Sequence, residues 1–329
     1  MIFRYSDDQL LFAQTVRDIL ANECPSAAVR GAWDNETGTG PGLWDTLAAT
    51  GVVGMTAPED AAGLGMTDLD LVLLMEAFGE AACPEVVLEH TAVALPLLAD
   101  VGSEGTRERW LAPAAAGEVR LSASLGSALV LGAAEASALI LSHDDELHLV
   151  PTSDVVLTPR RSVDETRRLS AVDWTPGPDT LLTNDGTVIE RARDRASVAA
   201  AAQAVGVAQR LLDATVEYVQ DRHQFGKPVG VNQAVKHHLA DVGKAIEFAR
   251  PMVYRAAWSL SVGAPDAGES ASMAKLLASE AVDLACRSSL QCHGAIAYTV
   301  EYDLQLWLKR GWALASAWGD ATHHRNRIG

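Results

Sequence analysis

The sequence has no long hydrophobic run, no signal-like start and no paired cysteine motif. No stretch approaches the roughly 18 apolar residues that a membrane-spanning helix needs. The first residues, MIFRYSDD, lack the apolar core and small-residue cleavage site of a signal peptide. The four cysteines show no Cys-x-x-Cys spacing. We therefore expect a cytoplasmic protein with reduced thiols and no membrane partner.

Positive charge is also scarce. The chain carries 26 Lys and Arg residues against 43 Asp and Glu residues, which gives a net charge of −17. This surplus argues against nucleic acid or an anionic membrane as a general partner. Apolar residues make up 48% of the 329 positions, with only 13 prolines and 26 glycines. The chain can therefore build a substantial core, as one large domain or about two to three packed subdomains.

Helical patterns dominate the N-terminal third. Ser6, followed by Asp7 and Asp8, predicts a capped helix start, because carboxylates in the first turn interact favourably with the helix dipole. Apolar spacing predicts helices over 6–22, 43–50, 67–80, 84–100 and 104–116. From 118 to 190, short alternating segments separated by turn residues predict strands at 121–125, 138–141, 146–150, 154–157 and 168–174.

Helical periodicity returns from residue 194 onward. Apolar residues then recur in steps of three and four, as on one buried face of a long helix, at Val235, Leu239, Val242, Ile246, Ala249 and Val253. Pro251 is expected to kink this helix or end it early. Further helices at 268–290 and 301–318 complete a bundle of four. The fold class is mainly α with a small β-domain: a helical domain at 1–117, a β-domain at 118–190 and a four-helix bundle at 191–329.

Two C-terminal segments carry the most specific motifs. The first is Asp-Arg-His-Gln-Phe-Gly-Lys-Pro at 221–228, followed on the next helix by Gln233 and Leu-Ala-Asp at 239–241. The second is Gln-Cys-His-Gly-Ala-Ile-Ala-Tyr-Thr-Val-Glu-Tyr at 291–302. A weaker third is the Pro-Glu and Gly-Leu-Gly turn at 58–65. With these segments the chain resembles the FAD-dependent acyl-CoA dehydrogenases over nearly its whole length. The resemblance implies an N-terminal helical domain, a middle β-domain and a C-terminal four-helix bundle.

The resemblance also implies that both segments reach across a subunit interface to FAD held mainly by the neighbour. The planar guanidinium of Arg222 would bind two pyrophosphate oxygens. Phe225 would contact an aromatic ring, and Gly226 would permit the turn. Ala295 stands at a family glycine position, as does Ala297, and its methyl group is expected to weaken the backbone contact with the nucleotide. The residues implied at the cofactor are Arg222, Gln224, Phe225, Gly226, Gln233 (one turn into its helix), Gln291, Gly294 and Ala295.

The family's own-chain half of the flavin site is missing. Its Thr-Glu-Pro, Gly-Ser-Asp and Trp-x-Ser motifs do not occur where residues 121–136 should carry them. The β-domain is also short, at roughly 70 residues between its expected boundaries. We therefore expect that a strand pair or long loop has been lost. The groups that hold the isoalloxazine and the acyl thioester in other members would then be absent from this chain.

The family's catalytic carboxylate is missing as well. Proton abstraction α to a thioester needs a carboxylate within hydrogen-bond reach of that carbon, opposite the flavin. In many members it lies nine residues after an arginine that matches Arg310, and here that position is Gly319. A second family position falls near Ala196. No catalytic residue is therefore assigned to this chain.

Four polar residues near these two positions offer weaker candidates. Asp194 and Asp320 are displaced-base candidates, although aspartates at helix ends are more often caps or solvated. The adjacent His323 and His324 look like a metal or acid–base pair. Without a third ligand, such residues near a chain end are expected at the surface, and no metal is assigned.

The resemblance is strongest to the short subunits of actinobacterial α2β2 acyl-CoA dehydrogenases of steroid side-chain degradation. It implies a full-length homologue as partner, which supplies the base and most of the flavin site and binds most of the acyl-CoA. It also implies an electron-accepting flavoprotein or similar acceptor. Because CoA is an anion and this chain is acidic, CoA binding needs a local basic site or the partner. Two alternatives remain: a self-sufficient homo-oligomeric dehydrogenase using Asp194 or Asp320, and a flavin-free scaffold or acyl-CoA-binding module.

Overall fold

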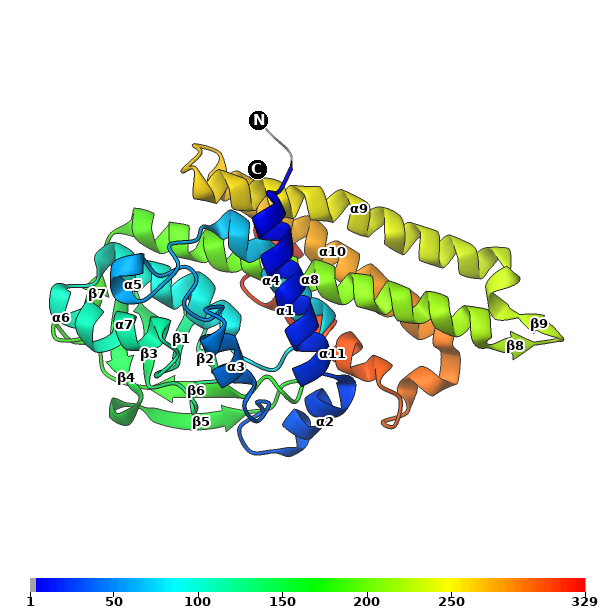
Figure 1. Cartoon of the computed structure of the whole chain (residues 1–329), viewed down its shortest axis with the longest axis horizontal. Coiled ribbons are helices and arrows are strands. Elements are labelled where there is room, and N and C mark those ends of the chain that lie inside the picture. The colour runs from blue at the N-terminus through cyan, green and yellow to red at the C-terminus, as the bar shows by residue number, and fades with distance from the viewer. Residues whose placement is uncertain (1–3, 329) are drawn as a thin grey trace.

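Figure 1 shows a small β region beside a bundle of long helices, in a computed structural model that describes residues 4–328. Helices α8, α9 and α10 run alongside one another and extend to the right of the view, away from the β region. The mainly helical fold class predicted from the sequence is confirmed. Within the described part of the chain, no helix is both long enough and apolar enough to cross a membrane.

The N-terminal region is helical, as predicted. Ser6 caps its first helix: the Ser6 hydroxyl accepts from the Gln9 N–H at 3.2 Å, and the Gln9 side chain accepts from the Ser6 N–H at 2.8 Å. The helix expected over 84–100 begins later, at Leu88, with a π-helical segment. The elements are α1 (Asp7–Glu23), α2 (Ser26–Asp34), α3 (Leu43–Ala49), η1 (Glu59–Ala61), α4 (Asp68–Glu80), η2 (Leu88–Ala94), α5 (Leu95–Val101), α6 (Glu104–Thr106), η3 (Arg107–Leu111) and α7 (Ala112–Ala115).

The β region forms two sheets around a small apolar core of its own. One sheet has the order β1-β3-β4-β7 and the other β2-β6-β5; only β1 and β3 pair in parallel. The short strands β2 and β7 were not predicted, because three residues are too few to show alternation. The elements are β1 (Leu121–Ser124), β2 (Leu129–Leu131), β3 (Ala138–His143), β4 (Glu146–Pro151), η4 (Thr152–Asp154), β5 (Val156–Arg160), β6 (Leu169–Asp173) and β7 (Leu181–Thr183).

The C-terminal region contains the expected four long helices and a short fifth. Its first helix begins at Gly186, so the expected division after residue 190 falls within its first turns. The elements are α8 (Gly186–Asp221), β8 (His223–Gln224), β9 (Lys227–Pro228), η5 (Val229–Val231), α9 (Gln233–Ser261), α10 (Ala267–His293), η6 (Gly294–Tyr298), α11 (Leu304–Ser316) and α12 (Ala321–Ile328).

Helix α9 continues through Pro251, so the expectation that this proline ends the helix early was wrong. Buried contacts hold the helix on both sides of the proline. The Arg250 guanidinium and the Tyr254 hydroxyl both donate to Glu76 of α4, at 2.8 and 2.7 Å. Because these contacts and the buried apolar face fix α9, tertiary packing outweighs the one backbone N–H that proline lacks.

Helices α4 and α8 cross closely because glycines face the partner backbone. A Cβ on Gly79 would lie 2.0 Å from the Gln203 carbonyl oxygen, and one on Gly206 would lie 2.0 Å from the Glu76 carbonyl oxygen. Only glycine permits this approach. The crossing fixes the course of α8, whose two ends lie at the two candidate sites described below.

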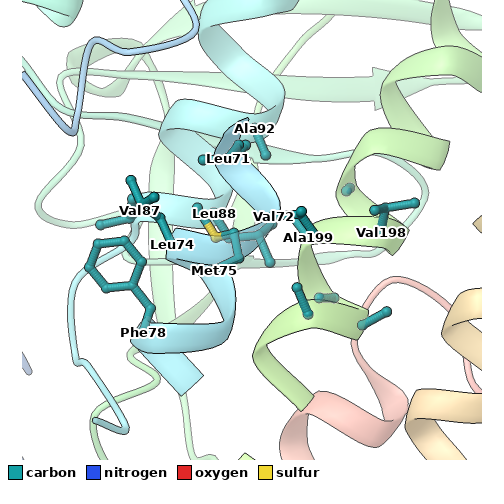
Figure 2. Close-up of a cluster of buried hydrophobic side chains, with 14 of the residues drawn as sticks. Leu71, Val72, Leu74, Met75, Phe78, Val87, Leu88, Ala92, Val198 and Ala199 are labelled. Carbon is teal, nitrogen blue, oxygen red and sulfur yellow. The ribbon is translucent and has the colours of Figure 1, made fainter. Parts of the chain in front are cut away.

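The centre of this crossing is the main apolar core. Figure 2 shows Leu74 and Met75 of α4 next to Val87 and Leu88 at the start of η2, with Ala199 of α8 on the other side. Every residue from 71 to 79 and from 196 to 208 is buried. These two segments therefore form the rigid base on which both candidate sites rest.

Arg310 of α11 joins the helices to the β region. It pairs with Asp164 in the β5–β6 loop, and its guanidinium donates to the Thr166 hydroxyl and the Cys83 carbonyl, each at 2.7 Å. Burial works against the charge, but the Asp164 carboxylate outweighs it and raises the pKa of Arg310. Since losing one partner of a buried pair leaves the other charge uncompensated, this contact stabilises the position of the whole β5–β6 loop.

Candidate functional site

The far ends of α8, α9 and α10 bring the two sequence motifs together. The chain turns from α8 through the β8–β9 hairpin into α9, at the tip of the helices on the right of Figure 1. A pocket of about 470 Å³ lies there, between the start of the hairpin and the end of α10. We call it the arm pocket. Its lining includes five of the residues implied at a cofactor: Arg222, Gln224, Gln291, Gly294 and Ala295.

The other three implied residues, Phe225, Gly226 and Gln233, do not line the arm pocket. Phe225 and Gly226 form the hairpin tip with φ values of +52° and +79°, as in a type I′ turn. The left-handed conformation is strained for phenylalanine, and this side chain is 99% exposed. Strain combined with full exposure favours contact with another molecule. Gln233 is exposed and is the first residue of α9, not one turn inside it as expected.

Polar groups in the arm pocket are left without partners. Among residues 4–328, none forms a hydrogen bond or ion pair with the Arg222 guanidinium. The His293 ring stacks on Tyr218 with 4.2 Å between ring centres, and its Nδ1 lies 2.8 Å from the Ser289 carbonyl oxygen. Its Nε2 is buried with no partner in the described chain, and burial lowers the pKa of His293.

The sequence analysis did not assign the Tyr218–His293 stack. His293 lies inside the second motif, and Tyr218 lies one helical turn before Arg222. Their positions relative to the two motifs could have indicated that Tyr218 and His293 belong to the same site. Together with Arg222 they give the arm pocket a cationic group, an aromatic surface and a buried nitrogen free to accept a hydrogen bond. Such a set suits a nucleotide with an anionic phosphate chain.

A larger cleft, of about 860 Å³, lies between the β region and the opposite end of the helices. Residues from β1, β2, α8, α11 and the 317–319 segment line it, among them Gly319, where the family's base is expected. We call it the Gly319 cleft. Because the cleft contains the position where the resemblance places the base, its geometry decides whether a base fits there.

A side chain at position 319 would be strained and would have to displace two histidine rings. Gly319 has a φ of +94°, a conformation that disfavours other residues. A Cβ atom there would lie 2.6 Å from His323 Cδ2 and 2.6 Å from His324 Nε2. Restoring a carboxylate at this position would therefore take more than one substitution, because the histidine rings of α12 would also have to move.

Three helices anchor the 317–319 segment through its carbonyl groups. The Ser197 hydroxyl donates to the Trp318 carbonyl at 3.3 Å, and His324 Nε2 lies 2.9 Å from the same oxygen. The fully buried Lys275 ammonium donates to the Gly319 carbonyl at 2.9 Å and to two carbonyls at the end of α11. Burial lowers the pKa of Lys275 to about 7 and that of His324 to about 4. These contacts leave the segment little freedom to place a catalytic group.

The two displaced-base candidates make other contacts. Asp194 is inside α8 rather than at a helix end, and it accepts from Arg327 of α12 at 2.9 Å. Burial raises the pKa of Asp194, and Arg327 opposes that rise. Asp320 is exposed and caps α12, accepting from the His323 N–H at 2.8 Å, which lowers the pKa of Asp320. Neither lines the Gly319 cleft. The expectation that both histidines are at the surface was wrong for His324, which is buried because it closes the 317–319 segment.

Two charged residues at the Gly319 cleft were missed by the sequence analysis. Glu89 of η2 is only 4% exposed, and burial raises its pKa, whereas the charge of Arg167 and a hydrogen bond with the Trp318 side chain oppose that rise. Arg167, from the β5–β6 loop, lines the same cleft. A single glutamate inside the apolar stretch at 86–95 was the only signal for this site in the sequence.

Comparison with known proteins identifies the family. A model of the acyl-CoA dehydrogenase N-terminal domain matches residues 6–118, and a model of the C-terminal domain matches residues 184–329. Acyl-CoA dehydrogenase IpdE2 of Mycolicibacterium smegmatis is 32% identical over 324 residues, which cover 98% of each chain. The chain belongs to the acyl-CoA dehydrogenase family. These two domain matches leave out residues 119–183, which contain the β region.

Solved structures share the whole acyl-CoA dehydrogenase fold. A chain of the ChsE4-ChsE5 complex from Mycobacterium tuberculosis superposes with a TM-score of 0.91, at 22% identity, over 100% of this chain and 98% of the other. A chain of the Tcur3481-Tcur3483 steroid ACAD G363A variant gives a TM-score of 0.91, at 24% identity, over 98% of this chain and 97% of the other. At these identities the likeness shows the fold alone.

Members of this family are FAD-dependent oxidoreductases, and the two sites of this chain fit FAD unequally. In the arm pocket, Arg222 and the orphaned His293 nitrogen suit the nucleotide and pyrophosphate end. In the Gly319 cleft, the family's flavin motifs are missing from the β region, and position 319 has no carboxylate. The residues present therefore fit one end of the cofactor in the arm pocket and do not fit its reactive end in the cleft.

Proposed function

We propose that this chain is a subunit of a heteromeric FAD-dependent acyl-CoA dehydrogenase, with a full-length homologue as its partner. The complex desaturates an acyl-CoA thioester between its α and β carbons. This chain contributes Arg222 and the rest of the arm pocket to FAD across the subunit interface, and the partner contributes the catalytic base. The observation that carries the proposal is the lack of a carboxylate at Gly319, alongside an arm pocket with an exposed, unpaired Arg222 and a buried, unpaired His293 nitrogen. A side chain at position 319 would also displace the His323 and His324 rings.

The arm is suited to an interface because its surface is exposed and partly apolar. Phe225 at the hairpin tip and Tyr298 and Val300 near the end of α10 are 99%, 74% and 66% exposed. Along α9, the apolar face is only half-buried at Val235 and Leu239, although it is fully buried from Val242 onward. An apolar face that leaves the core of its own subunit is suited to a partner.

The chemical requirements of each step indicate which subunit supplies the catalytic base and which supplies a contact with FAD. The chemistry that FAD supplies in this family is acceptance of the β-hydride, which needs a carboxylate on the other side of the substrate to take the α-proton. Asp194 is paired with Arg327 and Asp320 caps a helix, so neither is placed for that task. Arg222, by contrast, needs only to hold an anion, and it is free to do so.

The substrate class is proposed on similarity. One superposing structure is described as a steroid ACAD. A steroid side-chain CoA ester, bound mainly by the partner, is therefore the substrate that we propose. A net charge of −17 on this chain agrees with CoA binding elsewhere in the complex. An electron-accepting flavoprotein or similar acceptor would reoxidise the cofactor.

Two other functions make different predictions. A self-sufficient homo-oligomeric dehydrogenase would use Asp194 or Asp320 as its base and would purify with FAD bound. A flavin-free scaffold or acyl-CoA-binding module would never bind FAD, even within a complex. The unpaired Arg222 and the aromatic stack beside it favour a flavin-binding subunit over the scaffold. The missing carboxylate at Gly319 and the other contacts of Asp194 and Asp320 favour the heteromeric subunit over the self-sufficient enzyme.

Co-expression with the full-length homologue tests the proposal. We expect the chain alone to purify with little or no FAD and no dehydrogenase activity. Co-purified with its partner, it should yield a yellow complex that oxidises acyl-CoA with an artificial electron acceptor. A flavin-loaded, active homo-oligomer would establish the self-sufficient enzyme instead. A stable complex without flavin would establish the scaffold.

A further inference from the structure

The Gly319 cleft is large and is lined by two charged side chains, Glu89 and Arg167, which makes it a candidate site for a ligand of its own. Its volume of about 860 Å³ is within the range of small-molecule pockets, roughly 300–1,000 Å³. Glu89 reaches it from the π-helical segment η2, and such segments often occur at functional sites. Neither Glu89 nor Arg167 has a role in the proposed desaturation.

The side chains of Glu89 and Arg167 face the same cleft without pairing directly. Their opposite charges influence each other, yet they form no ion pair in the part of the chain that the structure describes. Asp164, the nearest acid in sequence to Arg167, is already paired with Arg310. Within residues 4–328 the Arg167 guanidinium has no hydrogen-bond acceptor, and hydrogen bonding from the Glu89 backbone and the Trp318 side chain only partly opposes the rise in the pKa of Glu89. A ligand atom between the two charges could bond both.

The rest of the cleft lining is mainly apolar or already paired. Leu129, Leu131, Leu169 and Trp312 provide apolar walls. The basic residues at α8 and α12 are neutralised: Arg193 pairs with Glu190, and Arg327 pairs with both Glu190 and Asp194. No cation at this end of the cleft is therefore left for a phosphate chain of the CoA type.

We propose that the Gly319 cleft binds an uncharged apolar molecule through a hydroxyl group placed between Glu89 and Arg167. An ionised carboxylate only accepts hydrogen bonds and a guanidinium only donates them, whereas a hydroxyl does both. The hydroxyl donates to Glu89 and accepts from Arg167, and the apolar body lies against the leucine and tryptophan walls. A ligand carboxylate would meet the charge of Glu89, and a ligand ammonium would meet that of Arg167, so the site selects the neutral group.

Three ligands with one apolar body test this selectivity: 1-adamantanemethanol, adamantane-1-carboxylate and 1-adamantylmethylamine. Their dissociation constants for the full chain are measured by calorimetry, without FAD or partner. We expect the alcohol to bind about ten-fold tighter than either charged ligand. Equal binding of the alcohol and the carboxylate, or no binding of the alcohol by the folded chain, would overturn the proposal.

Charge-removing variants separate this site from general adsorption. Glu89→Gln keeps the side-chain shape but leaves Arg167 unopposed, so the carboxylate should become the tightest ligand. Arg167→Met leaves Glu89 unopposed, so the amine should become the tightest. Glu85→Gln is the matched control, because Glu85 is also buried but does not line the cleft, and the parent order should persist. Folding of each variant is verified by circular dichroism. If both cleft variants rank the three ligands as the unmodified chain does, the assignment of Glu89 and Arg167 is contradicted.

This inference goes beyond the proposed function and does not rest on it. The ligand measurements use the chain alone, whereas the flavin measurements use the complex. A chain that selects the alcohol but never assembles with a partner would support this site and contradict the heteromeric subunit. A flavin-loaded complex, together with a chain that shows no selectivity among the three ligands, would support the heteromeric subunit and contradict the ligand site in the cleft.

Discussion

The two ends of α8 and α10 differ in how their polar groups are satisfied. At the arm pocket, the Arg222 guanidinium and the His293 Nε2 have no partners in the described chain. At the Gly319 cleft, roughly 40 Å back along α8 at about 1.5 Å per residue, Ser197, His324 and Lys275 bond the 317–319 segment. A buried polar group without a partner is unfavourable, so the buried His293 nitrogen indicates a missing ligand or subunit. The Arg222 guanidinium is exposed, so water can solvate it until an anion binds. At the cleft end, the carbonyl groups of the 317–319 segment are satisfied by their own chain, which indicates a structural role for that segment. The His324 Nδ1 nitrogen, and the Glu89 and Arg167 side chains that face the same cleft, are not satisfied in this way.

The largest expected effect is on folding at Gly319. Gly319→Ala adds a left-handed non-glycine residue and a clash with His323 and His324, which together should lower the free energy of unfolding by roughly 2–5 kcal/mol. Gly226→Ala is the matched control at the arm: its φ is also positive, but nothing lies within 4 Å of the added Cβ. We expect roughly 1–2 kcal/mol there. Denaturant unfolding measures the free energy of unfolding of both variants. Equal losses of stability would show that Gly319 is packed no more tightly than Gly226.

Acid should destabilise the cleft end through His324. The folded protein holds the pKa of His324 near 4, whereas an unfolded histidine has a pKa near 6.5. As pH falls from about 6.5 to about 4, the unfolded chain binds a proton that the folded chain does not, so stability decreases by up to about 3 kcal/mol. His324→Gln should flatten this part of the pH dependence of unfolding, with His323→Gln as the exposed control. An unchanged slope would show that His324 is not held neutral.

At the arm, the expected effect is on cofactor retention. Arg222→Ala should weaken FAD binding by the assembled complex by about 1.5–3 kcal/mol, or roughly 10- to 100-fold, because a charge-assisted contact with pyrophosphate is lost. The melting temperature of the chain alone should stay nearly the same, since the exposed Arg222 side chain forms no hydrogen bond or ion pair within residues 4–328. Flavin fluorescence during dilution gives the affinity. Unchanged retention would make Arg222 an ordinary surface residue.

The smallest expected effect is on turnover at the two aspartates. Asp194→Asn and Asp320→Asn should leave the rate of the complex nearly unchanged, because the base comes from the partner. Asparagine keeps the size of the side chain and still caps a helix. General acid–base catalysis typically contributes about 10²–10⁴-fold. A loss of that size in either variant, with flavin content intact, would place the base in this chain.

The sequence was informative where function depends on a contiguous motif. The segments at 221–228 and 291–302 could be recognised, although only the fold reveals that they line one pocket. The missing base at Gly319 could be found by counting, but not the absence of space for it, because the obstructing rings come from α12. Glu89 and Arg167 are far apart in sequence and meet only through the β5–β6 loop. His323 and His324 are neighbours with opposite burial, which no local pattern distinguishes.

The same limit applies to the fold. Periodicity predicted the long helices, but Pro251 lies inside α9 because contacts from α4 hold the helix on both sides. The strands β2 and β7 are too short to produce an alternating pattern and form only as neighbours of longer strands. Local propensity therefore gave the order of elements, and tertiary contacts decided their ends.

The ratio of FAD to protein in the purified complex tests the contrast between the two ends most directly. The account predicts one FAD for each pair of unlike chains, because this chain contributes an arm pocket but its own Gly319 cleft does not fit the reactive end of the cofactor. Absorbance of the released flavin against protein mass gives the ratio. One FAD for every chain, including this one, would contradict the account.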